Sequence, residues 1–334
     1  MNAAQAQTSK PLNTIQAVNL ALDEAMRTDP NVILLGEDIA DEQAGGIVGV
    51  TKGLSQKYGK SRVRSTPISE QAIIGAAIGA AIVGMRPVAE IMLMNFTAVA
   101  MDMIVNHAAK LRFMSGGQTH VPITIRTMTG AGFGTGGQHA DYLEAWFAHT
   151  PGIKVVAPSS PADAYGLMLA CIFDDDPCLF IENMPTYWNP GPAPQPGVRI
   201  PLGRANVLRP GTDVTVISYS RTVADCVAVA EKLSKEGVSA EVLDLRTISP
   251  LDVDTVLQSV AKTRRAVIVH EAVKAFGVGA EIATNINEHL FGQLKAPVGR
   301  VGAYFSPVPF AKVLETEFVP TPARIEAALR ATLK

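Results

Sequence analysis

The chain alternates short apolar runs with amphipathic stretches along its first half. Apolar runs typical of buried strands lie at 32–35, 88–93, 121–125, 155–157 and 178–181. The segments between them carry the amphipathic or small-residue pattern of helices. Strands that alternate with helices form parallel sheets that are covered on both faces. We therefore expect an open, mainly parallel α/β domain in this part of the chain.

A second alternating region follows a proline-rich interruption. Six prolines lie between 185 and 201, where neither a helix nor a central strand can continue. The pattern then resumes, with strands expected at 214–218, 240–243 and 266–269 and helices at about 222–235, 253–262 and 278–290. A chain of 334 residues also exceeds what one core usually supports. We expect a polar disordered arm (1–12), two α/β domains (13–184 and 204–334) and a linker between them (185–203).

Composition narrows the class of function. A formal net charge of -2 with mixed signs gives no reason to expect nucleic acid or a membrane as a partner. The polar start of the chain lacks the apolar core of a secretory signal, and the uncharged run 72–85 is too short to span a bilayer. Cys171, Cys178 and Cys226 have no metal-type spacing, so we expect buried, reduced thiols and a cytoplasmic protein.

The most informative motif is Thr-Pro-Ile-Ser-Glu-Gln at 66–71, which precedes the small-residue run 72–85 and Arg-Pro-Val-Ala-Glu at 86–90. Ser69 suits the N-cap of a helix, and Glu70 would lie in the first turn, where the helix dipole favours a carboxylate. Gly75 would let this helix approach a neighbour closely. On residue types alone, a buried helix with an ordinary charged first turn also explains the motif.

The same segment resembles the β subunit of thiamine-diphosphate-dependent 2-oxo acid dehydrogenases and acetoin dehydrogenase, and the resemblance continues along nearly the whole chain. Further motifs follow in the family's order: GED (36–38), GVTKGL (49–54), AAKLRFMSGG (108–117), VPITIRT (121–127), QH (138–139), PGIKVVAPS (151–159) and DLRTISPLD (244–252). The resemblance implies a thiamine-diphosphate pyrimidine-binding domain followed by a transketolase C-terminal-type domain.

The resemblance also implies which residues serve the cofactor. The glutamate that matches Glu70 hydrogen-bonds a ring nitrogen of the aminopyrimidine, which favours the tautomer that removes a proton from the thiazolium carbon. Phe96 matches the aromatic residue that packs on the aminopyrimidine, although a single aromatic side chain is also typical of a core. Glu37 follows the first strand, at the edge where open sheets collect ligands. Glu37 is therefore either part of an acidic network near the cofactor or a solvated strand end.

A glycine-rich loop at 130–138 leads to His139. No Lys-Ser/Thr pair follows the loop, so it is not a phosphate-binding P-loop. By resemblance, His139 lies at the mouth of the active site and donates protons when an acyl group passes to a lipoyl arm, a role that suits histidine as a residue type. The family often has His-Ser-Gln here, and the change to Ala140 and Asp141 leaves the local hydrogen bonding and the preferred substrate open. We expect His149 to be structural.

Three adjacent acids at 174–176 end a predicted helix, where carboxylates would lie beside free carbonyl groups. Either solvent or a cation must relieve this arrangement. The resemblance implies a monovalent-cation site with potassium as the expected ion. On that analogy the ligands are mostly backbone oxygens of Ile123, Cys171, Ile172, Asp174 and Asp176.

One half of a thiamine-diphosphate site is missing from the sequence. Enzymes of this class hold Mg²⁺ and the diphosphate with a Gly-Asp-Gly run and a later asparagine, and no such run occurs here. We therefore expect an α subunit to supply it. The resemblance implies an α2β2 heterotetramer with its cofactors at α/β interfaces. We expect His270 and Glu271, which follow a strand of the second domain, to face a partner subunit.

The resemblance thus implies a dehydrogenase component that decarboxylates a 2-oxo acid, such as pyruvate or a branched-chain acid, or cleaves acetoin. The acyl group would pass to a lipoyl-bearing acyltransferase. Segments 45–54 and 126–132 look most similar to acetoin-cleaving members. Two alternatives stay open: a transketolase-like carboligase or diketone-cleaving enzyme without a lipoyl partner, and a non-catalytic scaffold subunit.

Overall fold

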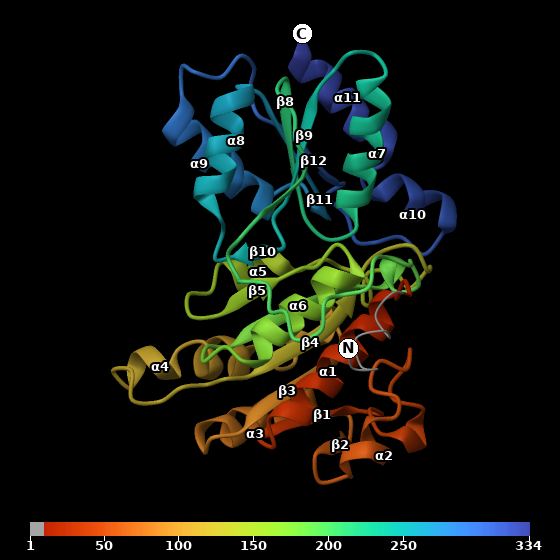
Figure 1. The fold of residues 1–334 in the computed structure, drawn as a ribbon, viewed down its shortest axis with the longest axis vertical. Coiled ribbons are helices and arrows are strands. Elements are labelled where there is room, and N and C mark those ends of the chain that lie inside the picture. The colour runs from red at the N-terminus through yellow and green to blue at the C-terminus, as the bar shows by residue number, and fades with distance from the viewer. Residues whose placement is uncertain (1–9) are drawn as a thin grey trace, which may run out of the picture. The chain divides into compact units, whose positions relative to one another are not determined.

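The computed structural model describes residues 10–334, which fall into two compact units (Figure 1). The first unit takes in the chain up to Thr129 together with 146–202, and the second comprises 130–145 and 203–334. The glycine-rich segment 130–145 therefore groups with the second unit, whereas the sequence places it in the first domain. Residues 1–9 of the expected arm lie outside the described part, and Leu12 already pairs antiparallel with Gly191.

The first unit contains a parallel sheet. Its strands lie in the spatial order β5 (Lys154–Val156), β6 (Cys178–Asn183), β4 (Thr124–Thr129), β3 (Arg86–Leu93), β1 (Val32–Glu37) and β2 (Val63–Thr66). The strands β1, β4 and β6 are buried at every position, and β1 and β6 accordingly begin with runs of consecutive apolar residues rather than an alternating pattern. The expected parallel α/β domain is confirmed.

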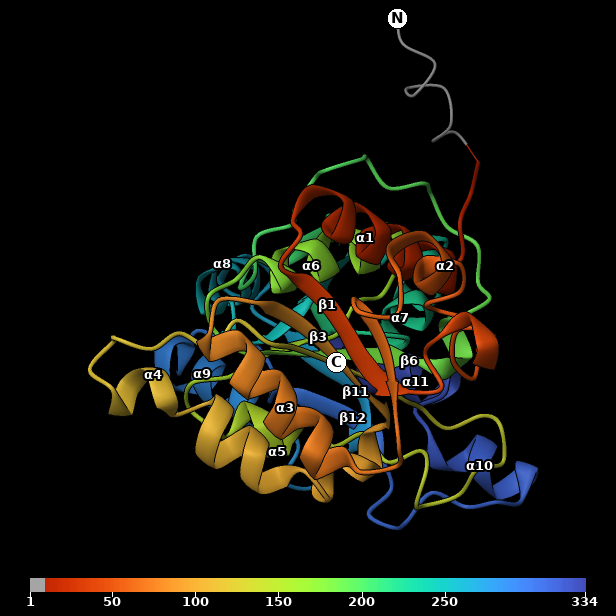
Figure 2. The same ribbon diagram turned by 90° about the horizontal axis from the view of Figure 1, so that it is seen from below.

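Helices cover both faces of this sheet (Figure 2). On one face α1 (Thr14–Thr28) packs against α6 (Pro161–Ile172), and on the other lies α3 (Glu70–Ile82). The short helices α2 (Leu54–Tyr58), α4 (Leu111–Met114) and α5 (Glu144–Ala148) lie in the connections. A capping box between Asn13 and Gln16 begins α1, and the Ser160 side chain caps α6.

The second unit contains its own five-stranded sheet. The spatial order is β12 (Gly299–Ala303), β11 (Ala266–Val273), β8 (Val214–Ser218), β9 (Ala240–Asp244) and β7 (Asn206–Arg209). The pairs are parallel except for β7, which runs antiparallel to β9. The short strand β10 (Thr247–Ser249) follows β9 along the chain.

Two pairs of helices lie on opposite faces of this second sheet (Figure 1). One pair is α7 (Thr222–Ser234) and α11 (Pro322–Leu333), and the other is α8 (Val253–Thr263) and α9 (Val278–Leu290). The remaining helix, α10 (Lys312–Phe318), precedes α11. Among the described residues, no helix is long and apolar enough to cross a membrane.

Candidate active site

Glu70 and Glu37 lie close together in the first unit. Glu70 is the first residue of α3 and is 8% exposed, and the buried Glu37 ends β1. Burial raises the pKa of Glu37, and the negative charges of Glu70, Asp38 and Glu90 raise it further. The sheet register pairs Glu37 of β1 with Thr66 of β2, four residues before Glu70, so both acids lie at the same edge of the sheet. The first turn of α3 therefore carries a buried acid at the edge of the sheet where β1 ends.

The N-cap of α3 differs from the expectation. Ser69 occupies the N-cap position, but its hydroxyl makes no hydrogen bond to the helix amides. It instead donates to the Pro67 carbonyl oxygen at 3.4 Å. The first-turn amides of α3 are therefore not satisfied by this side chain.

Phe96 lies in a 3₁₀ turn, Met94–Ala98, that follows β3. The Thr97 hydroxyl donates to the Met94 carbonyl oxygen at 2.6 Å and closes this turn. Phe96 is partly buried and packs against an apolar cluster that contains Leu93 and Tyr187. This packing restrains the Phe96 side chain and leaves part of it exposed, as an aromatic platform requires.

Sequence reasoning missed a buried ionic network at the centre of the sheet. The Arg126 guanidinium donates to Glu90 Oε2 at 2.5 Å and to both oxygens of Glu182 at 2.7 and 3.0 Å. The Tyr187 hydroxyl donates to Glu182 Oε2 at 2.8 Å. Burial raises the pKa of Glu90 and Arg126 opposes that shift. The signal in the sequence is a charged residue within each of the three neighbouring strands β3, β4 and β6.

The expected cation turn is neutralised by basic side chains. Lys154 Nζ lies 2.5 Å from Asp174 Oδ1 and 3.3 Å from Asp176 Oδ2, and Arg112 lies 2.5 Å from Asp176. Burial acts to raise the pKa of Asp176, but Arg112 and Lys154 outweigh it and the pKa is lowered. Protein cations therefore supply relief that the sequence assigned to an ion or to solvent.

The backbone oxygens of the same turn also have protein partners. Arg86 Nη1 donates to the carbonyl oxygens of Ile172 at 3.3 Å and Asp174 at 2.9 Å, and the Cys178 amide donates to the Ile123 carbonyl oxygen at 2.9 Å. A carbonyl oxygen has two lone pairs, so these bonds are compatible with ligation of a cation. The potassium site stays a prediction.

His139 lies in the second unit, at the end of the glycine-rich loop. Its amide donates to the Gly136 carbonyl oxygen at 3.2 Å, and its side chain is partly buried. Gly136 has a φ of 71°, and a Cβ there would lie 2.4 Å from the ring of Phe310. Only glycine combines this left-handed backbone with so close a ring. The short helix α5 begins at Glu144, five residues after His139.

The departure at Ala140 has a packing explanation. Ala140 is 2% exposed and belongs to an apolar cluster with Ala303, Val308 and Phe318. A hydroxyl at this position would need a partner inside an apolar cluster. His149, which we expected to be structural, is exposed.

A buried group of titratable side chains follows the loop. The Tyr219 hydroxyl donates to Glu144 Oε1 at 2.8 Å, and burial raises the pKa of Glu144 to about 8. His270 stacks on Tyr219 with ring centroids 6.1 Å apart, and burial lowers its pKa to about 4. His270 is fully buried, so the expectation that it faces a partner subunit is wrong. Its ring fills the space that the missing Cβ of Gly279 on α9 leaves open.

The three cysteines are free and buried, as expected. Burial raises the pKa of the Cys226 thiol to about 12, and it also raises that of Cys171. Thiols with raised pKa values are poor nucleophiles and poor metal ligands at neutral pH. The cysteines therefore serve the core.

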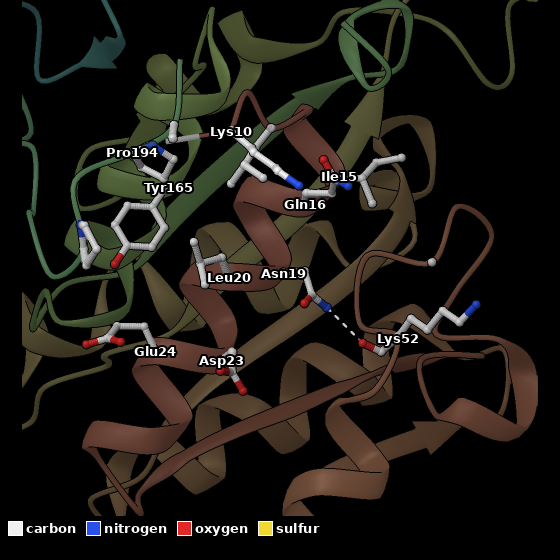
Figure 3. A pocket seen from close by; sticks show the side chains of 14 residues that line it. Lys10, Ile15, Gln16, Asn19, Leu20, Asp23, Glu24, Lys52, Tyr165 and Pro194 are labelled. Carbon is white, nitrogen blue, oxygen red and sulfur yellow. Dashed lines mark hydrogen bonds between the residues drawn. The ribbon is translucent and has the colours of Figure 1, made fainter. Parts of the chain in front are cut away.

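A cavity of about 670 Å³ lies in the first unit between α1 and the proline-rich segment (Figure 3). Figure 3 shows Gln16, Asn19 and Asp23 of α1 pointing toward it, with Tyr165 and Pro194 on another side. Its lining contains none of the residues that the sequence assigned to the cofactor. The cavity is therefore separate from the candidate site around Glu70.

The fold and the acidic cluster define a protein of the transketolase type. Residues 10–187 match the family model described as the transketolase pyrimidine binding domain, and residues 203–325 match the transketolase C-terminal domain. A solved structure, "Split gene transketolase, inactive beta4 tetramer", has a TM-score of 0.77 and covers 96% of this chain and 98% of its own. At 22% identity that likeness shows the fold alone.

Curated relatives specify the family. The acetoin:2,6-dichlorophenolindophenol oxidoreductase subunit beta of Cupriavidus necator is 45% identical over 98% of each chain, and that of Bacillus subtilis is 43% identical over 95% of this chain and 96% of its own. The human mitochondrial pyruvate dehydrogenase E1 component subunit beta is 43% identical over 95% of this chain and 89% of its own. This chain belongs to the family of β subunits of thiamine-diphosphate-dependent acetoin and pyruvate dehydrogenase E1 components.

Proposed function

We propose that this chain and an α subunit form an α2β2 heterotetramer that cleaves acetoin or decarboxylates a 2-oxo acid. The acyl fragment then passes to a lipoyl-bearing acyltransferase. The observation that carries the proposal is the burial of Glu70 at the start of α3. A second buried acid of the same unit, Glu37, has a raised pKa because of its burial and the nearby negative charges. A carboxyl group in such surroundings can share a proton with a ring nitrogen.

The residues present fit thiamine diphosphate. When bound, the cofactor supplies the carbon nucleophile that attacks the substrate carbonyl and accepts the charge released by carbon–carbon cleavage. Glu70 would hold a proton at the aminopyrimidine nitrogen, and Phe96 would pack on that ring. Glu37 would keep negative charge near Glu70 and so favour the shared proton. His139 would donate protons at the mouth of the site during acyl transfer.

The α subunit follows from two observations. The sequence lacks the Gly-Asp-Gly run that holds Mg²⁺ and the diphosphate, and the relatives from Cupriavidus necator and Bacillus subtilis are each named as a subunit beta. In the proposal Mg²⁺ is therefore held mainly by the α subunit. The proposal also includes a potassium ion at the 174–176 turn and a cytoplasmic location. Several relatives are named as mitochondrial proteins.

Acetoin is the first substrate to test. Segments 45–54 and 126–132 are the ones that look most similar to acetoin-cleaving members. The identities with acetoin and pyruvate relatives are close, at 45% and 44%, so overall similarity does not choose between them. The shared pocket also depends on residues of the α subunit.

The test uses this chain co-expressed with its candidate α subunit. Reduction of dichlorophenolindophenol is measured with acetoin, pyruvate and branched-chain 2-oxo acids. Glu70→Gln should lower the rate about 10²–10⁴-fold, because it removes a general acid–base group. Gln71→Ala changes the exposed neighbour on the same turn and should keep full activity.

Two results would count against the proposal. Full turnover by the Glu70→Gln complex would remove the proposed role of Glu70. An assembled wild-type complex that turns over none of these substrates would favour the scaffold alternative, and product formation without any electron acceptor would favour the carboligase.

A further inference from the structure

The glycine-rich loop at 130–138 forms a cradle for an anion, and the anion is a carboxylate of the same chain. Glu315 on α10 is 1% exposed. Its Oε1 accepts from the Gly132 amide at 2.5 Å and from the Gly134 amide at 3.1 Å, and Oε2 lies 3.2 Å from the Gly134 amide. Backbone amides that converge in this way make an anion-binding concavity.

The glycines are needed for this geometry. Gly132 has a φ of 143° and Gly134 a φ of 66°, both in the region that side-chain-bearing residues rarely adopt. The loop is thus shaped to aim its amides at Glu315. The 130–138 loop lacks the sequence of a phosphate-binding loop, and its amides bind the carboxylate of Glu315 instead.

A second carboxylate holds the start of the loop. Glu271 is 4% exposed, and its Oε1 accepts from the Ala131 amide at 2.9 Å. Arg221 Nη1 donates to the Ala131 carbonyl oxygen at 2.5 Å and lies 3.3 Å from Glu271 Oε1. Both backbone groups of Ala131 are therefore satisfied by one ion pair.

The exposed side of the loop has a weaker contact. Lys312 Nζ donates to the Gly132 carbonyl oxygen at 2.9 Å and lies 3.8 Å from Glu315. The Lys312 side chain is 75% exposed, so water screens this interaction. The buried acids, rather than Lys312, carry most of the constraint.

We propose that Glu315 and Glu271 are positioning residues that fix the 130–138 loop and thereby hold His139 in place for acyl transfer. The proposal rests on the proposed function of His139. The residues after Gly134 are themselves held, because Gly136 lies against the Phe310 ring and the His139 amide bonds to Gly136. Displacement at Gly132 and Gly134 is therefore transmitted to His139.

The test separates acyl transfer from the earlier steps in the assembled α/β complex. Turnover is measured with a lipoyl domain as acceptor and, separately, with dichlorophenolindophenol. Glu315→Ala should lower the lipoyl-dependent kcat about tenfold to a hundredfold, since misplacing a reacting group by about 1 Å costs on the order of 10²-fold. The dye-dependent rate should fall by a much smaller factor.

Two variants serve as controls. Glu315→Gln retains a carbonyl oxygen that accepts from both glycine amides, so it should restore most of the lipoyl-dependent rate. Glu317→Ala removes an exposed acid from the same helix and should match the wild type. If Glu315→Ala fails to assemble, Glu315→Asp provides the test, because it keeps the charge but shortens the reach to the Gly132 and Gly134 amides; the lipoyl-dependent rate should then fall selectively by about two- to tenfold.

Hydrogen exchange supplies a readout that does not depend on activity. The amides of Gly132 and Gly134 should be protected in the wild type, exposed in Glu315→Ala and protected again in Glu315→Gln. Equal losses with both acceptors, or a lipoyl-dependent rate equal to that of Glu317→Ala, would overturn the positioning role. If the wild type turned over with neither acceptor, the proposed function would fail, while the exchange data would still report on the loop.

Discussion

Replacing Arg126 with methionine should destabilise the first unit by about 3–5 kcal/mol, the cost of leaving buried charges without their partner. The side chains of Arg126, Glu182 and Glu90 are only 4%, 1% and 15% exposed. Water therefore cannot replace the lost guanidinium. Methionine keeps much of the volume of the arginine stem, so the loss reports on charge rather than on a cavity.

An exposed ion pair of the same unit provides the matched control. Arg112 and Asp176 approach to 2.5 Å, but their side chains are 44% and 31% exposed. Arg112→Met should therefore cost only about 0–1 kcal/mol. The contrast between the two arginines isolates the effect of burial.

Urea unfolding followed by tryptophan fluorescence measures these losses. Both tryptophans, Trp146 and Trp188, belong to the first unit, and Trp188 packs edge-on against Tyr187 of the network. Adding Glu90→Gln and Glu182→Gln to Arg126→Met should restore part of the stability, because it removes the unpaired charges. The reasoning is refuted if Arg126→Met costs no more than Arg112→Met.

Three further outcomes follow from the structure. Between about pH 4.5 and 8 the folded state keeps a proton on Glu144 that the unfolded state releases. The stability that this proton contributes at low pH is therefore lost progressively as the pH rises from about 4.5 to about 8. Glu144→Gln should flatten that decline, about 1.4 kcal/mol per pH unit, in urea titrations across pH 5–8, and an unchanged slope would contradict it. Gly136→Ala should lower the melting temperature, because the new Cβ would meet the Phe310 ring. Adding Phe310→Ala should recover part of that loss, and no recovery would contradict the ring contact. The buried Cys226 should react with a thiol reagent at pH 8 only after unfolding, and native labelling would show that it is accessible.

The sequence predicts strands best where both faces of a strand are buried. The runs at 32–35 and 178–181 lie inside β1 and β6. The run at 121–125 is displaced, since β4 begins at Thr124 and continues through the polar residues to Thr129. The edge strand β2 is half exposed and has no apolar run, so its sequence gives no strand signal. The formation of an edge strand therefore depends on pairing with its neighbouring strand rather than on a hydrophobic pattern in its own sequence.

The candidate site could be predicted only where one motif carries it. The position of Glu70 at a helix start follows from the motif at 66–71. The Arg126 network depends on sheet register, which places Glu90 of β3 directly opposite Arg126 of β4. The contact of Glu315 with Gly132 joins residues 183 positions apart. Contacts of this range depend on tertiary structure that local spacing does not contain.

Calorimetry of thiamine diphosphate and Mg²⁺ binding tests the central claim most directly. The co-purified α/β complex is titrated beside this chain alone, each with and without Mg²⁺. The divided site predicts Mg²⁺-dependent binding by the complex and none by this chain, with weaker binding when Glu70→Ala removes the proposed contact to the aminopyrimidine. Tight Mg²⁺-dependent binding by this chain alone, or no binding by the complex, would contradict a site shared between two subunits.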